Sequence, residues 1–214
     1  MNEIGNVVRG TTALVVVLAT AMCAVPVQAD SSSALVLLRA LPSAPEHVGG
    51  YDRSLFADWQ DRDGDGCDTR DEVLIAEAVA GVVQGCAVVS GRWISLYDGT
   101  VVSDASALDI DHVVALSEAW DSGAWRWNAG RRARFANDLG YAWALIAVTA
   151  GSNRSKSDDD PAQWQPDEGR CRFAKAWIGV KFRWRLAVDT QERAALQRLL
   201  RGCSAGMRVP ALAD

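Results

Sequence analysis

Three short segments of the 214-residue chain carry side chains that could do acid–base and metal chemistry. They are Asp-Ile-Asp-His-Val-Val at 109–114, Phe-Ala-Asn-Asp-Leu at 135–139 and Asn-Arg-Ser-Lys-Ser-Asp at 153–158. A neutral imidazole can deprotonate water near pH 7. Oxygen atoms of Asp and Asn are ligands that suit Mg²⁺ or Mn²⁺. A base and a hard cation together are what the hydrolysis of a phosphodiester requires.

A strand, a second strand and a helix could bring these segments to one point. The pattern predicts a strand over 108–116, a mostly helical stretch over 117–139 and a short β-branched strand over 145–149. A helix is expected to begin at Asn153, and an inserted helix at about 117–135 explains the 41 residues that separate His112 from Asn153. Taken singly, each residue has a structural reading: His112 paired with a carboxylate, Asn153 as a helix cap, and Asn137 in a turn.

The rest of the chain also reads as alternating helices and strands. We expect helices over 31–41, closed by Pro42, and over 71–83. A strand pair is expected over 86–102, with a turn near Asp98 and Gly99. Two helices over 171–187 and 190–202 end the chain, and Asp189 with Glu192 three residues later predicts a capping box for the second.

Together these segments resemble the HNH (ββα-metal) nucleases. More closely, the chain resembles a secreted actinobacterial HNH endonuclease family related to the C-terminal domain of the GmrSD enzymes. The resemblance also rests on YDRSLF at 51–56, GCDTR at 66–70, DHVVALSEAW at 111–120 and NRSKSDDDPAQW at 153–164. It implies an α+β fold with a ββα-metal (HNH or His-Me finger) core embedded in a mostly helical domain. The implied activity is metal-dependent endonucleolytic hydrolysis of DNA, with RNA left open as a substrate.

The resemblance also implies roles for individual residues. His112 matches the general base, Asp111 and Asn153 match the metal ligands, and Asn137 matches the central asparagine that pins the loop of the ββα unit. The final histidine of many HNH proteins is missing, which favours one Mg²⁺ (or Mn²⁺) over zinc. Phosphate contacts are assigned to three basic residues: Arg154, Lys156 and Arg70.

The acidic segment 61–72 fits the twelve-residue loop of an EF-hand. Gly66 occupies the position of the turn glycine. The expected Ca²⁺ ligands are Asp61, Asp63, Asp65, the carbonyl of Cys67, and Glu72. The alternative is an acidic turn anchored by a disulfide. A calcium-binding extracellular interaction module without catalysis is therefore the second function that the sequence allows.

Residues 1–29 are typical of a secretory signal peptide. An apolar run from Thr11 to Val25 is followed by Val27-Gln28-Ala29, which fits a cleavage site, and a retained membrane anchor is the alternative. Four cysteines then remain, an even number that suggests two disulfides in an exported protein. Zinc would need a different spacing. Of the three possible connectivities we favour the local pairs, Cys67–Cys86 and Cys171–Cys203.

Charge divides the chain unevenly, although its net charge is only −5. Residues 30–125 contain 5 basic and 17 acidic side chains, whereas residues 126–214 contain 16 basic and 9 acidic ones. The basic half could contact phosphates, or simply form the solvated faces of amphipathic helices. We therefore expect an acidic N-terminal segment (30–105) packed on an HNH core with C-terminal helices (106–214). The expected protein is a secreted monomer that does not stay on the membrane, takes a nucleic acid, DNA above all, as substrate, and could have an inhibitor or immunity protein as partner.

Overall fold

The computed structural model describes residues 31–213, which form helices and three small antiparallel sheets. The α-helices are α1 (Ala34–Ala40), α2 (Thr69–Glu77), α3 (Leu116–Asp121), α4 (Ala129–Ala136), α5 (Ala150–Lys156), α6 (Arg170–Trp184) and α7 (Thr190–Leu200). The short 3₁₀ turns are η1 (Arg53–Leu55), η2 (Ala105–Ala107) and η3 (Ala124–Arg126). The strands are β1 (Ser31–Ser33), β2 (Ala80–Gln84), β3 (Ala87–Ile94), β4 (Val101–Val102), β5 (Leu108–His112), β6 (Leu145–Thr149) and β7 (Gly206–Arg208). The fold is thus of the mixed α+β class.

The middle of the chain forms two antiparallel strands followed directly by a helix. Strands β5 and β6 pair from Leu108 opposite Thr149 to His112 opposite Leu145. Helix α5 starts at the next residue, Ala150, and Thr149 caps it by accepting a hydrogen bond from the backbone of Ser152. The connection between the strands holds α3, η3 and α4, in the region where the sequence predicts helical structure.

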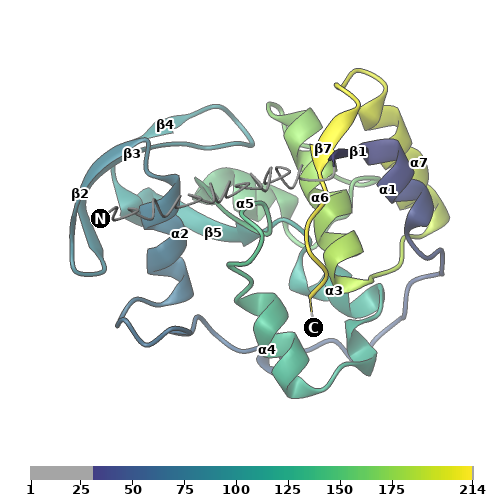
Figure 1. Cartoon of the computed structure of the whole chain (residues 1–214), viewed down its shortest axis with the longest axis horizontal. Coiled ribbons are helices and arrows are strands. Elements are labelled where there is room, and N and C mark those ends of the chain that lie inside the picture. The colour runs from purple at the N-terminus through teal and green to yellow at the C-terminus, as the bar shows by residue number, and fades with distance from the viewer. Residues whose placement is uncertain (1–30, 214) are drawn as a thin grey trace, which may run out of the picture.

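The remaining elements flank this unit on two sides (Figure 1). The sheet β2–β3–β4 lies at one end of the molecule, and α1, α6 and α7 lie at the other, beside the β1–β7 pair. One buried hydrophobic cluster runs through both ends and includes Trp93 of β3, Ile146 of β6 and Trp177 of α6. Burial of large aromatic and branched side chains is the main force that holds such layers together.

A buried ion cluster ties the inserted helices to the C-terminal ones. The ammonium of Lys181 in α6 lies 2.5 Å from a carboxylate oxygen of Glu118 in α3 and 2.7 Å from one of Glu192 in α7. The same ammonium donates to the carbonyl of Ala187, and the indole of Trp177 donates to Glu192. Burial raises the pKa of Glu192 to about 7, although the charge of Lys181 opposes this shift.

Several predicted elements are confirmed at residue level. The strand 145–149 is found as β6, and the strand pair over 86–102 is found as β3 and β4, with Gly99 at positive φ in the turn. Asp189 caps α7 and forms a capping box with Glu192. Both local disulfides are present, Cys67–Cys86 and Cys171–Cys203.

Four predicted boundaries are wrong. The helix expected over 31–41 begins only at Ala34, because Ser31–Ser33 pair with β7 as β1. The helix expected over 71–83 ends at Glu77, because residues 80–84 pair with β3 as β2 and turn at Gly85, which has positive φ. The strand expected to continue to residue 116 ends at His112, because α3 begins at Leu116. Asn153 does not begin its helix: α5 starts three residues earlier, which puts Asn153 in the second turn, facing β5.

The signal peptide predicted over residues 1–29 lies outside the described residues. Among residues 31–213, no helix is both long enough and apolar enough to cross a membrane.

Candidate functional site

His112, at the end of β5, is held on both faces and at one nitrogen. Its ring stacks on Trp59, with 5.1 Å between ring centroids, and lies nearly parallel to Phe135 of α4 at 6.4 Å. Its Nε2 lies 2.9 Å from the carbonyl oxygen of Ala136. A carbonyl oxygen only accepts hydrogen bonds, so Nε2 must carry the proton and Nδ1 must present a lone pair.

The surroundings of this ring favour its neutral form. The side chain is only 8% exposed, and burial lowers the pKa of His112 to about 3. The nearby charges of Arg53 and Lys156 lower the pKa further, whereas the Ala136 carbonyl raises it by stabilising the protonated ring. At neutral pH the ring is therefore an uncharged acceptor of one proton.

Asn137 fixes the residues that hold the ring. Its side-chain amide donates to the carbonyls of Asp58 and Ala133, and its oxygen accepts from the backbone of Gln60 at 2.9 Å. It thereby anchors both the end of α4, which supplies the Ala136 carbonyl, and the segment that carries Trp59. Asn137 is buried and acts through its neighbours, which makes it a positioning residue.

Asp111 is buried next to His112 and bonded at both oxygens. One oxygen accepts from the ammonium of Lys156 at 2.9 Å, and the other accepts from the hydroxyl of Tyr97 at 2.5 Å. Burial raises the pKa of Asp111, and the charge of Lys156 opposes that shift. The ammonium of Lys156 also donates to the backbone carbonyl of His112, so it orients both residues of the Asp-His pair.

Asn153 reaches back from α5 to β5. Its side-chain nitrogen donates to Asp109 at 3.1 Å, which leaves the carboxamide oxygen as the atom that can face a ligand. Asp109 lies two residues before Asp111 in the same strand, so the two side chains project from the same face.

These residues meet at a cleft of about 390 Å³. Its walls come from β5, α3, α5 and the segment 51–53, and its lining residues are Tyr51, Arg53, Ile110, Asp111, His112, Ala115, Leu116, Asn153, Arg154, Ser157 and Asp158. Two other clefts are larger, about 630 and 460 Å³, but neither contains a histidine. The 390 Å³ cleft is therefore the candidate site, on chemical grounds and not on size.

The structure brings together most of the predicted residues but changes the role of two of them. His112, Asp111, Asn153 and Arg154 line the cleft. Asn137 does not line it, but bonds to the backbone on both sides of Trp59, which stacks on His112. Lys156 is 0% exposed, and its ammonium is bonded to protein atoms, so its position does not fit a phosphate contact. Arg70 does not line the cleft either: its guanidinium donates to the carbonyls of Ala105 and Leu108 and so fixes the start of β5.

Five residues of the site were given no role there by the sequence reasoning, although Asp109, Tyr51 and Arg53 lie in segments that it singled out. Asp109 could have been found from its spacing of two from Asp111 in a predicted strand. The others come from distant segments and gave no usable periodic signal: Tyr51, Arg53, Trp59 and Tyr97.

The oxygen donors at the cleft match the preference of a hard divalent cation. Asp111 and Asn153 offer carboxylate and carboxamide oxygens, and no thiol lines the cleft. Each carboxylate oxygen has two lone pairs, so the bonds from Lys156 and Tyr97 leave Asp111 able to bind a cation as well. The donor set therefore fits Mg²⁺ or Mn²⁺ in type.

The acidic loop 61–72 has the backbone turns of a cation-binding loop. The carboxylate of Asp61 accepts from the backbone of Gly64 at 2.8 Å and of Gly66 at 3.0 Å, and Gly66 has positive φ. Oxygen atoms of Asp61, Asp63 and Asp65 lie within 4.8 Å of one another. The pKa of Glu72 in α2 is raised, first by the loss of solvent around its carboxylate and then by the nearby charges of these aspartates.

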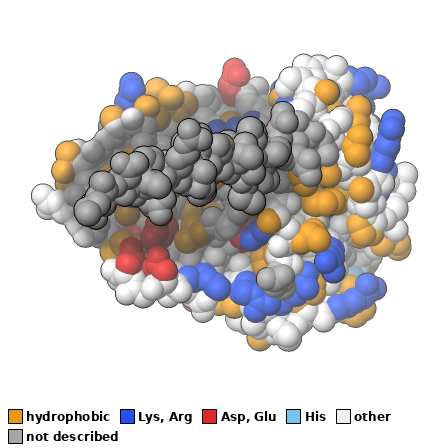
Figure 2. All heavy atoms as spheres, viewed as in Figure 1, with side chains coloured by type: hydrophobic (Ala, Val, Ile, Leu, Met, Phe, Trp, Pro, Cys, Tyr) orange, Lys and Arg blue, Asp and Glu red, His pale blue; other side chains and the backbone are white. Residues whose placement is uncertain are grey.

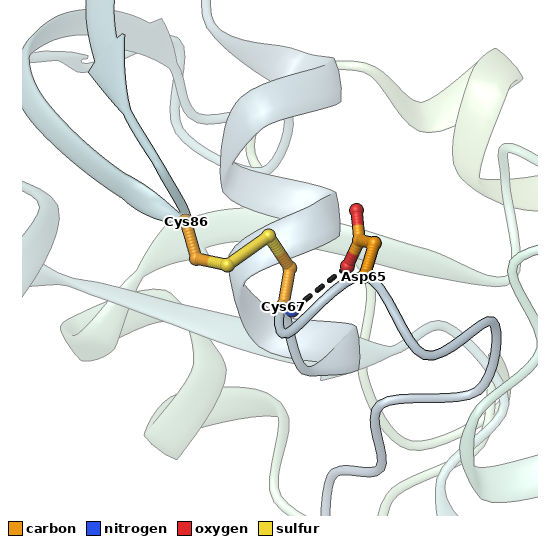
Figure 3. Close-up of side chains that lie close together, drawn as sticks. All are labelled: Asp65, Cys67 and Cys86. Carbon is orange, nitrogen blue, oxygen red and sulfur yellow. Dashed lines mark hydrogen bonds between the residues drawn. A yellow bond between two sulfur atoms is a disulfide. The ribbon is translucent and has the colours of Figure 1, made fainter.

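Cys67 takes part in this loop through its backbone. Its N–H donates to Asp65 at 2.8 Å, while its sulfur is bonded to Cys86 (Figure 3). The sulfur atoms near Asp65 are thus oxidised and do not form a thiolate metal site. The disulfide instead anchors the loop to the β2–β3 hairpin.

Comparisons with known proteins place this arrangement in a family context. The sequence profile described as "GmrSD restriction endonucleases, C-terminal domain" matches residues 80–199. The chain is also 40% identical to a protein of Arthroderma benhamiae described as "Uncharacterized secreted protein", over 182 residues that cover 84% of this chain and 87% of the relative. No solved structure gave a significant match to the chain.

Proposed function

The chain belongs to the family of the C-terminal domain of GmrSD restriction endonucleases, and from this premise we propose that it is a metal-dependent HNH endonuclease that hydrolyses phosphodiester bonds in DNA. The observation that carries the proposal is the state of His112. A neutral ring with its Nδ1 lone pair available lies at a cleft that also offers oxygen donors and arginines. The order β5, β6, α5 is also the order of elements that a ββα-metal core would have.

His112 is the proposed general base. Its Nδ1 takes a proton from the attacking water, and the ring then carries a positive charge. Trp59 and Phe135 keep the ring from rotating, and the Nε2–H bond to the Ala136 carbonyl stabilises the charged ring. Burial is the main cause of the low pKa of this ring.

Asp111 and Asn153 are the proposed ligands of one Mg²⁺ (or Mn²⁺). When bound, the cation would neutralise charge on the phosphate and on the leaving oxygen. Lys156 and Tyr97 orient Asp111, and Asp109 orients the amide of Asn153. Such supporting contacts typically change metal affinity or activity by about 10- to 100-fold when they are removed.

Arg154 and Arg53 are the proposed phosphate contacts. Both side chains are exposed, both line the cleft, and they come from two different elements, α5 and η1. Guanidinium groups bind phosphate oxygens in a bidentate manner. Arg53 thus takes the place that the sequence reasoning gave to Lys156 and Arg70.

We place this activity outside the cell. Two disulfides are typical of an oxidising compartment, and the fungal relative is described as secreted. A nuclease released in this way would act as a monomer on free nucleic acid.

Plasmid cleavage tests the proposed activity. We expect the chain from Asp30 onward to nick supercoiled DNA in Mg²⁺ or Mn²⁺ and to be inactive in EDTA. Asp111→Asn and Asn153→Ala should each lower the rate by about 100-fold or more, since each removes a metal ligand. Gln197→Ala, on the exposed face of α7, is the matched control. A folded wild-type protein that cleaves neither DNA nor RNA with any of these ions would refute the proposal.

A second function, Ca²⁺ binding by the loop 61–72, is favoured by the turn that Asp61 makes with Gly64 and Gly66. We propose that the loop takes one structural Ca²⁺ through Asp61, Asp63, Asp65, the Cys67 carbonyl and Glu72. In a protein without catalysis, this loop would be the basis of a calcium-binding interaction module.

Thermal unfolding in Ca²⁺ tests this loop. At a Ca²⁺ concentration of 100 times Kd, binding should stabilise the fold by about 2.7 kcal/mol, which raises Tm by about 5–10 °C for a domain of this size. Asp61→Asn with Glu72→Gln should abolish the rise, whereas Asp104→Asn, an exposed helix-cap carboxylate elsewhere, should leave it unchanged. An equal rise in Tm for the double variant would show that Ca²⁺ binds elsewhere.

A further inference from the structure

Arginines gather on one face around α4. Arg131 and Arg134 belong to α4, Arg126 ends η3 and Arg185 follows α6. Basic side chains form a band along the lower edge of the molecule in Figure 2, where Figure 1 places α4. The guanidinium of Arg131 donates to the carbonyl of Trp184, the residue before Arg185. Burial, followed by the charges of Arg185 and Arg134, lowers the pKa of Arg131.

Three arginines of this face have no acidic partner among the described residues. Within residues 31–213, Arg126, Arg131 and Arg185 form no ion pair with a carboxylate. The first turn of α4 also contains no acidic residue. Like charges held together in this way repel one another, and a bound polyanion would relieve the repulsion.

A flat stack of side chains lies at one end of this cluster. Trp125 is 36% exposed, and its ring stacks on His47 with 4.4 Å between centroids and 17° between planes. The guanidinium of Arg126 lies 4.4 Å from the centroid of the same ring. Exposed aromatic and guanidinium planes are the surfaces on which unpaired nucleobases stack in proteins.

The segment 47–55 connects this face to the cleft. His47 is four residues from Tyr51 in the cleft wall, so their Cα atoms are at most about 14 Å apart. On the other side, Arg132 of α4 donates to the carbonyl of Leu55, in the same 3₁₀ turn as Arg53 of the cleft. A short stretch of nucleic acid could therefore contact both.

We propose that the α4 surface, formed by Trp125, Arg126, Arg131, Arg134 and Arg185, binds a single strand of nucleic acid that leads into the His112 cleft. The arginines contact phosphates, and the Trp125 stack takes one unpaired base. A paired base is stacked within the duplex and cannot reach such a plane, so single-stranded substrate is favoured over duplex. Only one part of this inference rests on the proposed function, namely that the bound strand leads into a catalytic cleft.

Binding can be measured without cleavage. Fluorescence anisotropy would follow a labelled 20-nucleotide oligo(dT), and a 20-base-pair duplex beside it, with the His112→Ala protein in EDTA. We expect the single strand to bind more tightly. Trp125→Ala should weaken its binding about tenfold, with little change in salt dependence, because the lost contact is stacking.

Charge removal gives an independent readout. The triple variant Arg126→Gln, Arg134→Gln, Arg185→Gln should reduce the slope of log K against log salt by about 2, since each phosphate contact contributes about 0.7 for a single strand. Arg131 is kept because its guanidinium donates to the Trp184 carbonyl and supports the fold. The matched control replaces three exposed arginines elsewhere by glutamine: Arg198, Arg201 and Arg208.

The outcomes separate this surface from the catalytic proposal. Equal slopes of log K against log salt for the two triple variants would overturn the proposed surface. It would also be overturned if the duplex bound at least as tightly as the single strand and Trp125→Ala did not weaken single-strand binding. If the wild-type protein binds oligo(dT) as expected but cleaves no nucleic acid, the proposed nuclease activity is wrong and the proposed binding surface is still supported. Unchanged Tm values for both triple variants would show that the differences are not due to unfolding.

Discussion

His112→Ala is expected to lower the rate of plasmid cleavage by about 10²- to 10⁴-fold, the range that a positioned general base contributes. The ring lies at the cleft with Nε2–H committed to Ala136 and Nδ1 left as the basic atom. Among the residues that line the cleft, no second imidazole is available to replace it. Nicking of supercoiled plasmid over time, in saturating Mg²⁺, measures the loss.

A structural role for the same ring would give a different result. The alanine variant leaves a ring-sized gap between Trp59 and Phe135, so added imidazole should restore part of the activity. His112→Gln keeps a donor for the Ala136 carbonyl and should stay folded but inactive. If His112→Gln, with an unchanged Tm, cleaves at the wild-type rate, the assignment of the base is wrong.

Lys181→Met is expected to destabilise the fold by about 3–5 kcal/mol, because it leaves buried carboxyl groups without their counter-charge. The side chain is 0% exposed, and its ammonium contacts both Glu118 and Glu192. Methionine fills nearly the same space, so the loss reports charge rather than volume. For a domain of this size the change corresponds to a drop in Tm of about 10 °C.

Two further variants check this explanation. Glu118→Gln and Glu192→Gln added to Lys181→Met should recover much of the stability, since no unpaired charge is then buried. The loss of folding stability caused by Lys181→Met should also become smaller as the pH falls from 8 to 5. The folded variant binds protons at its buried carboxyls more tightly than the unfolded chain does, and lower pH therefore favours folding. Arg198→Met, exposed on α7, should cost little, and a loss below about 1 kcal/mol for Lys181→Met would contradict the argument.

Local signals in the sequence were enough for some elements. The β-branched run 145–149 and the Asp189–Glu192 spacing predicted β6 and the cap of α7, because strand propensity and capping depend on neighbouring residues. The local cysteine pairs were also found. The helix expected over 71–83 was wrong after Glu77, because pairing with β3 and the Cys67–Cys86 bond favour a strand there over helical periodicity.

The candidate site was predicted in part for the same reason. Residue types identified His112, Asp111 and Asn153, which the structure gathers at one cleft. The environment of these residues could not be predicted, because it is built from long-range contacts. Trp59 and Tyr97 lie 53 and 14 residues from their partners, and whether Lys156 contacts a phosphate or a buried Asp111 depends on burial that the sequence does not reveal.

The long connection between β5 and β6 also bears on the order in which this protein matures. Closing a loop that contains α3 and α4 costs more chain entropy than forming a tight hairpin, and contacts of high sequence separation form late. The pair α6–α7, by contrast, is local and is joined by Cys171–Cys203. His112 obtains its ring contacts and its Nε2 partner only when Trp59, Phe135 and Ala136 have all reached their positions in the fold. The contacts that prepare His112 for its proposed role as the base would therefore be among the last parts of the fold to form.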